Sequence, residues 1–514
     1  MNGAESLIRT LVAADVTTCF ANPGTSEIHI VQALDRIAEM RCVLGLFEGV
    51  VTAAADGYAR MAGKPACTLL HLGPGLGNGL ANLHNASRAQ VPIINIVGQH
   101  ATYHLHYDAP LTSDIEGIAR PYSKWLRTSK GVGEIGADAA DAVIAARTAP
   151  GRIATLIVPA DLAWSEGGVA ASASRIPSAP MPDTRRIESA AATLRCGAPT
   201  AILISGNGLY GEGLSAAGRI AASTGAKLFA PYPVTRLERG AGLPAVDRVA
   251  YVLDQGIEQF KEFRHLILVG AQAPVAYFAY PGKSSKFTSP ECQIQTLAAP
   301  NEDLVGALES LAEAVGKSQT QSLSSKAECP PLPQGNITLP GLASVVGALL
   351  PENAIVVDES MTSGRGMMAA SKGAPPHDWL GNTGGSIGIA LPLAVGAAIA
   401  SPERRVLCLT ADGSAMYTLQ ALWTMARESL NVTTVVFANR DYAVLKREYS
   451  YLGVGNPGSR ASSMFEIGHP DLDWVQMAKG MGVPARRVNS LELFAKALRD
   501  GFIAEGPTLI EVPL

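Results

Sequence analysis

The stretch 404–441, RRVLCLTADGSAMYTLQALWTMARESLNVTTVVFANRD, decides the fold class. An apolar run rich in strand-forming residues leads into Asp412, a helical pattern follows, and a second such run ends at Asn439. Strand, helix and strand in this order predict a βαβ unit of a parallel sheet. Because the carboxyl ends of parallel strands form the ligand-binding edge of such a sheet, we expect Asp412 and Asn439 to lie close together.

The residue types at this edge favour a divalent cation and a phosphate group. Mg²⁺ prefers oxygen ligands, so Asp412, Asn439 and a main-chain carbonyl near Asp441 could hold it against a diphosphate. Gly413 allows a close backbone approach, and Ser414 with the following helix N-terminus offers donors to phosphate oxygens. The alternative is an ordinary turn in which the Asp caps a helix. The paired spacing of Asp412 and Asn439 favours the metal site.

The chain is long enough for about three domains, since it has 514 residues. Each third alternates short apolar strands with helical patterns, which predicts an α/β fold of three doubly wound parallel sheets. We place the domains at 1–166, 184–316 and 339–514. The intervening segments 167–183 and 317–338 are rich in small residues, Ser, Gln and Pro, which is typical of linkers.

Composition disfavours several classes of function. The net charge is −4 and charged residues make up 17% of the chain, so no strong positive field exists to attract nucleic acid. Seven cysteines without a C-x-x-C pair suit neither a disulfide framework nor a zinc site, and we expect a cytoplasmic protein. The uncharged run 379–402 is long enough to span a membrane. Its glycines and Pro392 instead favour a buried helix after a glycine turn.

This pattern resembles the thiamine diphosphate (ThDP) dependent 2-oxo acid decarboxylase and acetolactate synthase superfamily. The signature of that family is a Gly-Asp-Gly turn followed further along the chain by an Asn. Here Ala411 replaces the first Gly, which removes no ligand. The resemblance covers nearly the whole chain and implies a pyrimidine-binding N-terminal domain, a central domain and a diphosphate-binding C-terminal domain. It also implies ThDP and Mg²⁺ as cofactors, with Tyr442 among the residues that bind ThDP.

Glu48 is the predicted catalytic carboxylate of the N-terminal domain. It lies between VLGLF and GVVTAAA, where an unpaired carboxylate would lose its hydration, although a Glu there could simply cap a helix. In the family that FEGVVTAAADGYAR resembles, this Glu hydrogen-bonds N1′ of the aminopyrimidine, which allows the ring to take the C2 proton of the thiazolium. The resemblance also implies that Gly385 supplies a carbonyl to the aminopyrimidine and that Ile387 packs under the cofactor.

His71 and Thr25 are further catalytic candidates. A lone His after an apolar strand is more often structural than catalytic. The position of His71, however, resembles that of the active-site His of benzoylformate decarboxylases, which acetolactate synthases generally lack. Thr25 matches a substrate-side Ser of the same enzymes, and both residues would serve as proton relays or carboxylate contacts. The second catalytic His of benzoylformate decarboxylases is replaced here by Phe278 and Ala279.

The central domain carries no recognisable flavin motif. It lacks the Arg-Phe-Asp-Asp-Arg type sequence of acetolactate synthases, and the glycine pattern at 206–211 lacks the acidic residue that a dinucleotide site needs about 20 positions on. We therefore expect FAD to be absent from the cofactors and the glycine pattern to form a tight turn.

These features predict a ThDP- and Mg²⁺-dependent lyase or carboligase acting on 2-oxo acids. Protonation after decarboxylation would give an aldehyde, and ligation to an aldehyde or ketone acceptor would give a 2-hydroxyketone. Two alternatives stay open: an acetolactate synthase-type transferase that makes 2-acetolactate from pyruvate, and a non-catalytic ThDP-binding regulatory paralogue. Because the family builds each site between two subunits, the resemblance implies at least a homodimer and favours a homotetramer.

Overall fold

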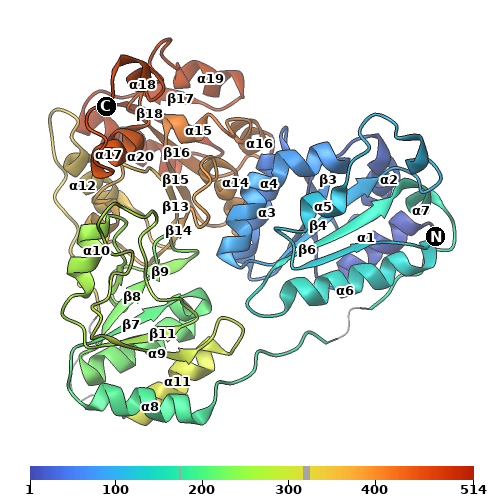
Figure 1. Cartoon of the computed structure of the whole chain (residues 1–514). Helices are drawn as coiled ribbons and strands as arrows, with labels where there is room; N and C mark the ends of the chain where they lie inside the picture. The colour runs from blue at the N-terminus through green and yellow to red at the C-terminus, as the bar shows by residue number, and fades with distance from the viewer. Residues whose placement is uncertain (173–174, 317–323) are drawn as a thin grey trace.

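The computed structural model describes residues 1–172, 175–316 and 324–514, and it contains three sheets flanked by helices (Figure 1). This arrangement confirms the predicted α/β class with parallel sheets. The predicted linkers at 167–183 and 317–338 fall in part, at 173–174 and 317–323, outside the described residues.

The N-terminal sheet is parallel and has the strand order β2-β1-β3-β4-β6-β5. Its central strands are buried on both faces, which explains why they are continuous apolar runs rather than alternating ones. Its elements are α1 (Gly3–Ala13), β1 (Thr18–Asn22), α2 (Ile28–Arg36), β2 (Arg41–Leu44), α3 (Glu48–Ala62), β3 (Ala66–Leu70), α4 (Leu72–Ala89), β4 (Ile93–Gln99), α5 (Ile115–Ala119), β5 (Trp125–Thr128), α6 (Ile135–Arg147), β6 (Ile153–Pro159) and α7 (Ala160–Trp164).

The central sheet is also parallel, in the order β10-β8-β7-β11-β12. Its elements are α8 (Thr184–Arg195), β7 (Thr200–Ile204), α9 (Gly211–Thr224), β8 (Lys227–Ala230), β10 (Val246–Arg248), α10 (Leu253–Phe260), β11 (His265–Val269), β12 (Gln293–Ala298) and α11 (Leu304–Val315). One strand of this part of the chain, β9 (Leu237–Arg239), does not belong to the central sheet. It pairs antiparallel with β14 of the C-terminal sheet.

The C-terminal sheet has the order β17-β18-β16-β15-β13-β14-β9. Its elements are α12 (Leu339–Leu349), β13 (Ile355–Glu359), α13 (Met367–Ala370), β14 (His377–Gly381), α14 (Ala390–Ala400), β15 (Val406–Ala411), α15 (Asp412–Ala415), α16 (Ala421–Arg427), β16 (Val432–Ala438), α17 (Ala443–Tyr451), α18 (Ser459–Ser463), α19 (Trp474–Gly480), β17 (Ala485–Arg487), α20 (Leu491–Ile503) and β18 (Thr508–Pro513). The parallel register of β15 and β16 brings Ala411 opposite Phe437, so Asp412 and Asn439 emerge at the same edge.

The N-terminal and C-terminal domains share one hydrophobic core, in which α3 packs against α14 (Figure 1). The uncharged run 379–402 contains the end of β14, a loop and the buried helix α14. Within the described residues, no helix is long and apolar enough to cross a membrane.

Candidate active site

Asp412 lies where β15 passes into α15, and its side chain is 2% exposed. Its Oδ1 accepts the main-chain N–H of Gly413 at 2.8 Å, and its Oδ2 accepts that of Arg440 at 2.7 Å. Burial raises the pKa of Asp412, and these N–H donors oppose the rise. The carboxylate is therefore held by main-chain groups at the ends of both strands.

Asn439 and Asp441 complete an oxygen-rich edge. The Asn439 side-chain oxygen accepts the N–H of Asp441 at 3.2 Å. Lys446 pairs with Asp441 Oδ2 at 2.6 Å, whereas the buried Oδ1 has no hydrogen-bond partner. In the part of the chain that is described, no group of three or more His, Cys, Asp or Glu could hold a metal ion. A cation here would therefore rely on one carboxylate, one amide oxygen and main-chain carbonyls, a set suited to a hard ion such as Mg²⁺.

A cavity of about 670 Å³ lies above this edge, between the C-terminal and central domains. Its wall contains all the cofactor-binding residues predicted in the C-terminal domain, namely Gly385, Ile387, Gly413, Ser414, Asn439 and Tyr442. It also contains Asp441, which was predicted, like Asn439, to bind the metal. Asp412 immediately precedes Gly413 at the start of α15. The Gly413 backbone also lies close to Tyr442, because a Cβ at 413 would be 2.6 Å from its ring.

An aromatic wall from the central domain faces these residues. It contains Phe278 and Ala279, the residues that replace the second catalytic His of benzoylformate decarboxylases. It also contains tyrosines at 232, 251, 277 and 280. Tyr280 donates to Glu448 at 2.7 Å, and burial raises the pKa of Tyr277 to about 12. Sequence reasoning missed the tyrosines because they follow no motif.

Glu359 is a buried carboxylate that the sequence did not single out. It accepts hydrogen bonds from the N–H of Gly388 at 3.0 Å, the N–H of Ala390 at 3.1 Å and the Asn382 side chain at 3.0 Å. Glu359 therefore holds both ends of the loop between β14 and α14. This loop carries Gly385, which has a φ of +80°. Burial raises the pKa of Glu359 to about 7, although its hydrogen-bond donors oppose that rise.

The N-terminal domain presents a separate group of polar residues. Glu48 is half-buried at the start of α3, and Asn78 donates to its Oε2 at 3.0 Å. His71 follows β3 and precedes α4. Gly75 lies between the two, because a Cβ there would be 3.3 Å from both Glu48 Oε1 and His71 Cβ. The structure thus brings Glu48 and His71 together.

Glu27, which sequence reasoning missed, orients His71. Its side chain is fully buried, and its Oε2 lies 2.7 Å from His71 Nδ1 and accepts the Gly24 N–H at 2.8 Å. A Cβ at Gly98 would be 1.6 Å from Glu27 Oε1, so only glycine fits beside the carboxylate. The available signal was a single Glu within the otherwise uncharged stretch FANPGTSEIHI.

Thr25 is exposed at the start of a short 3-10 helix, Thr25–Glu27. The hydroxyl near His71 is instead that of Ser26, whose Oγ lies 3.5 Å from Nδ1. None of Glu48, His71 and Thr25 is among the described residues that line the 670 Å³ cavity. The predicted site is therefore divided within one chain into a C-terminal half and an N-terminal half.

Comparisons with known proteins match both halves. The family model "Thiamine pyrophosphate enzyme, N-terminal TPP binding domain" matches residues 1–118, and "Thiamine pyrophosphate enzyme, C-terminal TPP binding domain" matches residues 363–512. A Mycobacterium tuberculosis protein, provisionally named acetolactate synthase large subunit IlvX, is 52% identical over 513 residues, which cover 100% of this chain and 99% of that protein. Benzoylformate decarboxylase from Pseudomonas aeruginosa is 28% identical over 97% of this chain and 96% of that enzyme.

A solved structure has the same fold. The thiamine diphosphate-dependent 4-hydroxybenzoylformate decarboxylase of Rhodococcus jostii aligns with a TM-score of 0.88 at 24% identity, covering 100% of this chain and 99% of that enzyme. The family models and the 52% identical full-length relative confirm the family that the sequence predicted. The chain belongs to the thiamine pyrophosphate (ThDP) enzyme family.

Proposed function

We propose that this protein is a ThDP- and Mg²⁺-dependent lyase or carboligase that acts on 2-oxo acids. The observation that carries the proposal is the pair of strand ends that brings Asp412 and Asn439 together beneath a 670 Å³ cavity in a chain of this family. When bound there, ThDP supplies a carbon nucleophile that adds to the keto group and accepts the electron pair left as CO₂ departs.

The residues at the C-terminal edge fit this cofactor. Asp412, Asn439 and the main-chain carbonyl of Asp441 would hold Mg²⁺, and Ser414 would bind the diphosphate. The buried Asp412 carboxylate supports this assignment, because it forms no ion pair with a cationic side chain in the described part of the chain. Gly385 and Ile387 would contact the pyrimidine half of ThDP.

The N-terminal residues would transfer protons to and from the cofactor and the substrate. Glu48 would exchange a proton with N1′ of the pyrimidine. Because the Glu27 carboxylate accepts from Nδ1 of His71, the other ring nitrogen, Nε2, is left to accept or donate a proton at the substrate. The aromatic wall of the central domain would exclude water from the cavity and contact an apolar substrate side chain.

We propose at least a homodimer, in which Glu48 of one copy completes the cavity of another. The absence of Glu48 and His71 from the described wall of the cavity supports this arrangement. A tetramer built from two such dimers extends the same symmetry.

A second candidate is an acetolactate synthase-type transferase that makes 2-acetolactate from pyruvate. The name of the 52% identical relative favours it. The hydrogen-bonded pair of Glu27 and His71 favours the first proposal instead, since it supplies the acid and base that aldehyde release requires.

The test is the exchange of the C2 proton of bound ThDP, followed by NMR in the wild type and in Glu48→Gln. We expect Glu48→Gln to slow exchange by about 10²–10⁴-fold, as loss of a general acid–base group does. Equal exchange rates in the two proteins would overturn the catalytic role of Glu48. If the wild type binds ThDP but does not accelerate C2 proton exchange, the protein is a regulatory paralogue. Product analysis with pyruvate and with aromatic 2-oxo acids then separates the two catalytic candidates.

A further inference from the structure

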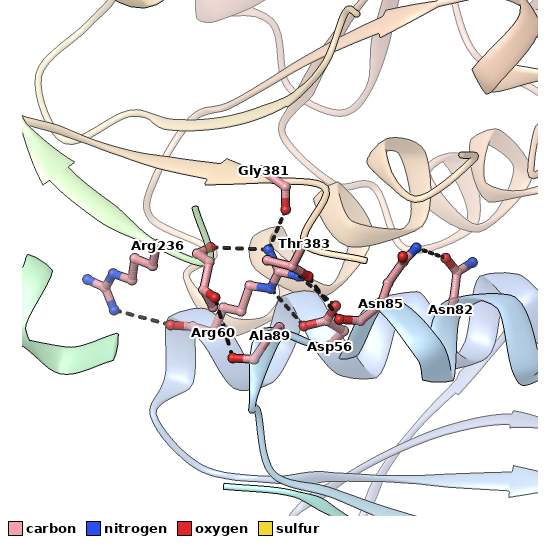
Figure 2. Close-up of polar contacts among 9 residues, drawn as sticks. Asp56, Arg60, Asn82, Asn85, Ala89, Arg236, Gly381 and Thr383 are labelled. Carbon is pink, nitrogen blue, oxygen red and sulfur yellow. Dashed lines mark hydrogen bonds and ion pairs between the residues drawn. The ribbon is translucent and has the colours of Figure 1, made fainter. Parts of the chain in front are cut away.

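The loop between β14 and α14, residues 382–389, carries the two residues assigned to the pyrimidine half of ThDP. It does not contact only its own domain. Helices α3 and α4 of the N-terminal domain lie against it, and Figure 2 shows the polar side chains that cross between them. The N-terminal domain therefore contacts the cofactor loop of its own chain as well as presenting Glu48 and His71.

Asn85 on α4 binds the loop as a peptide group would. Its side chain is fully buried, donates to the Ser386 carbonyl at 2.8 Å and accepts the Ser386 N–H at 3.1 Å. The second N–H of its amide goes to Asn82 Oδ1 at 3.0 Å, and Asn82 in turn donates to the carbonyl of Gly49 at 2.8 Å. An unbroken hydrogen-bonded path therefore joins the loop to the residue next to Glu48.

Arg60 in the last turn of α3 binds the start of the same loop. A two-point ion pair with Asp56, with both contacts at 2.7 Å, orients the guanidinium, and both side chains are fully buried. Two of the remaining donors reach the Gly381 carbonyl at 2.7 Å and the Thr383 hydroxyl at 3.1 Å (Figure 2). A third reaches the Thr235 carbonyl at 3.1 Å. Burial raises the pKa of Asp56, and Arg60 opposes the rise. Breaking this set would leave a buried charge without its partner, which is costly.

Thr383 links the two contacts. Its hydroxyl accepts from Arg60 and donates to the main-chain carbonyl of Asn85 at 2.8 Å. The helices behind these side chains leave no space for sliding: a Cβ at Gly57 would be 2.1 Å from the Leu393 carbonyl oxygen, and one at Gly396 would be 1.9 Å from that of Ala54. The loop is therefore held by side chains of both α3 and α4, and the α14 helix that follows it is packed tightly against α3.

We propose that Asn85 and Arg60 are positioning residues that hold the cofactor loop of their own chain in its ThDP-binding shape. This inference rests on the proposed function, in which Glu48 at the other end of α3 serves the cavity of a neighbouring copy. The 15-residue helix α3 would then join two active sites. It brings the acid–base carboxylate to one site and fixes the pyrimidine-binding loop of the other.

The test compares Asn85→Asp with Asn95→Asp in the full-length protein. Asn95 is an equally buried Asn of the same domain, and its side chain bonds the Thr68 and Thr155 hydroxyls, away from the loop. Both variants bury one new carboxylate. In Asn85→Asp the carboxylate faces the Ser386 carbonyl without a proton to share, whereas in Asn95→Asp the hydroxyls can donate to it.

The measurement is titration of the cofactor-free protein with ThDP in the presence of Mg²⁺, together with C2 proton exchange at saturating ThDP. We expect Asn85→Asp to bind ThDP at least tenfold more weakly and to exchange more slowly once saturated. Asn95→Asp should stay within about twofold of the wild type on both measures. A shared loss of thermal stability would not produce this difference.

Equal losses in the two variants, or wild-type affinity in Asn85→Asp, would overturn the inference. If Asn85→Asp does not fold, Thr383→Val decides, because it removes the hydroxyl that links Arg60 to Asn85 from a half-buried position. Weakening of ThDP binding by about threefold or more supports the inference, and unchanged binding overturns it. Failure of the wild type to bind ThDP would instead contradict the proposed function.

Discussion

At the C-terminal sheet edge, main-chain N–H groups of two strand ends hold Asp412, whereas at the N-terminal edge Glu48 is half-buried and is bound by the exposed side chain of Asn78. The first arrangement forms as soon as the sheet forms, because the donors belong to the backbone. The second leaves a carboxylate facing outward from the start of a helix. This contrast is what the proposed homodimer would explain, with one half of the site complete within a single chain and the other half supplied to a second copy.

The largest expected difference between the halves is in ThDP binding. Asp412→Ala should weaken Mg²⁺-dependent ThDP binding by at least a hundredfold, because it removes the carboxylate ligand of the cation. Glu48→Gln should change that affinity by less than about tenfold, because Gln can still hydrogen-bond the pyrimidine. Calorimetric titration of both variants checks this, and equal losses would break the division into a binding half and a proton-transfer half.

Mixing the same two variants tests whether the halves come from different copies. In a mixed dimer, intact Glu48 of one chain faces intact Asp412 of the other, so one of the two sites is restored. Random exchange of subunits should therefore recover about a quarter of the wild-type sites. C2 proton exchange before and after unfolding and refolding the mixture measures the recovery. No recovery, in a mixture that does form mixed dimers, would place both halves in one chain.

Within the N-terminal half, Glu27→Gln should lower turnover of the preferred 2-oxo acid by about tenfold, because His71 loses the charged acceptor that orients its ring. The C2 exchange of ThDP should be unchanged, since Glu48 is intact. Ser26→Ala is the matched control, because the Ser26 hydroxyl is 3.5 Å from the same ring nitrogen. Slower C2 exchange in Glu27→Gln would contradict separate roles for Glu27 and Glu48.

Within the C-terminal half, Glu359 should give stability a pH dependence. Its folded pKa of about 7 lies above the ordinary 4.5, so its contribution is fully present below about pH 4.5 and is lost as pH rises through about 7. The thermal unfolding midpoint of the wild type should therefore fall by a few degrees relative to Glu359→Gln between pH 5 and pH 8. The exposed Glu352→Gln should show no such change. Parallel pH profiles for wild type and Glu359→Gln would refute the prediction.

The sequence predicted those parts of the site that local patterns determine. Asp412 and Asn439 follow strands that alternate with helices, so the topology of a parallel sheet brings them together. Glu359 could not be found in this way, because its donors lie at the start of α14, and their proximity arises only when the sheet folds. Glu27 was missed for the same reason, since its partner His71 follows a different strand.

The fold was predictable to a similar extent. Buried parallel strands are recognisable as apolar runs, and the three sheets follow from them. The strand Leu237–Arg239 has only three residues and no such run, and it pairs with a sheet of another domain. Its position depends on a contact between two domains, which local sequence patterns do not reveal.

The backbone contact between α3 and α14, at Gly57 and Gly396, also bears on how the polypeptide is connected. The two ThDP-binding domains share one hydrophobic core, so their association does not depend on the covalent link between residues 166 and 184. A chain cut in that link should reassemble from two separately produced fragments. The N-terminal domain could therefore be exchanged between related enzymes as a free subunit, provided that both glycines and the surface they create are retained.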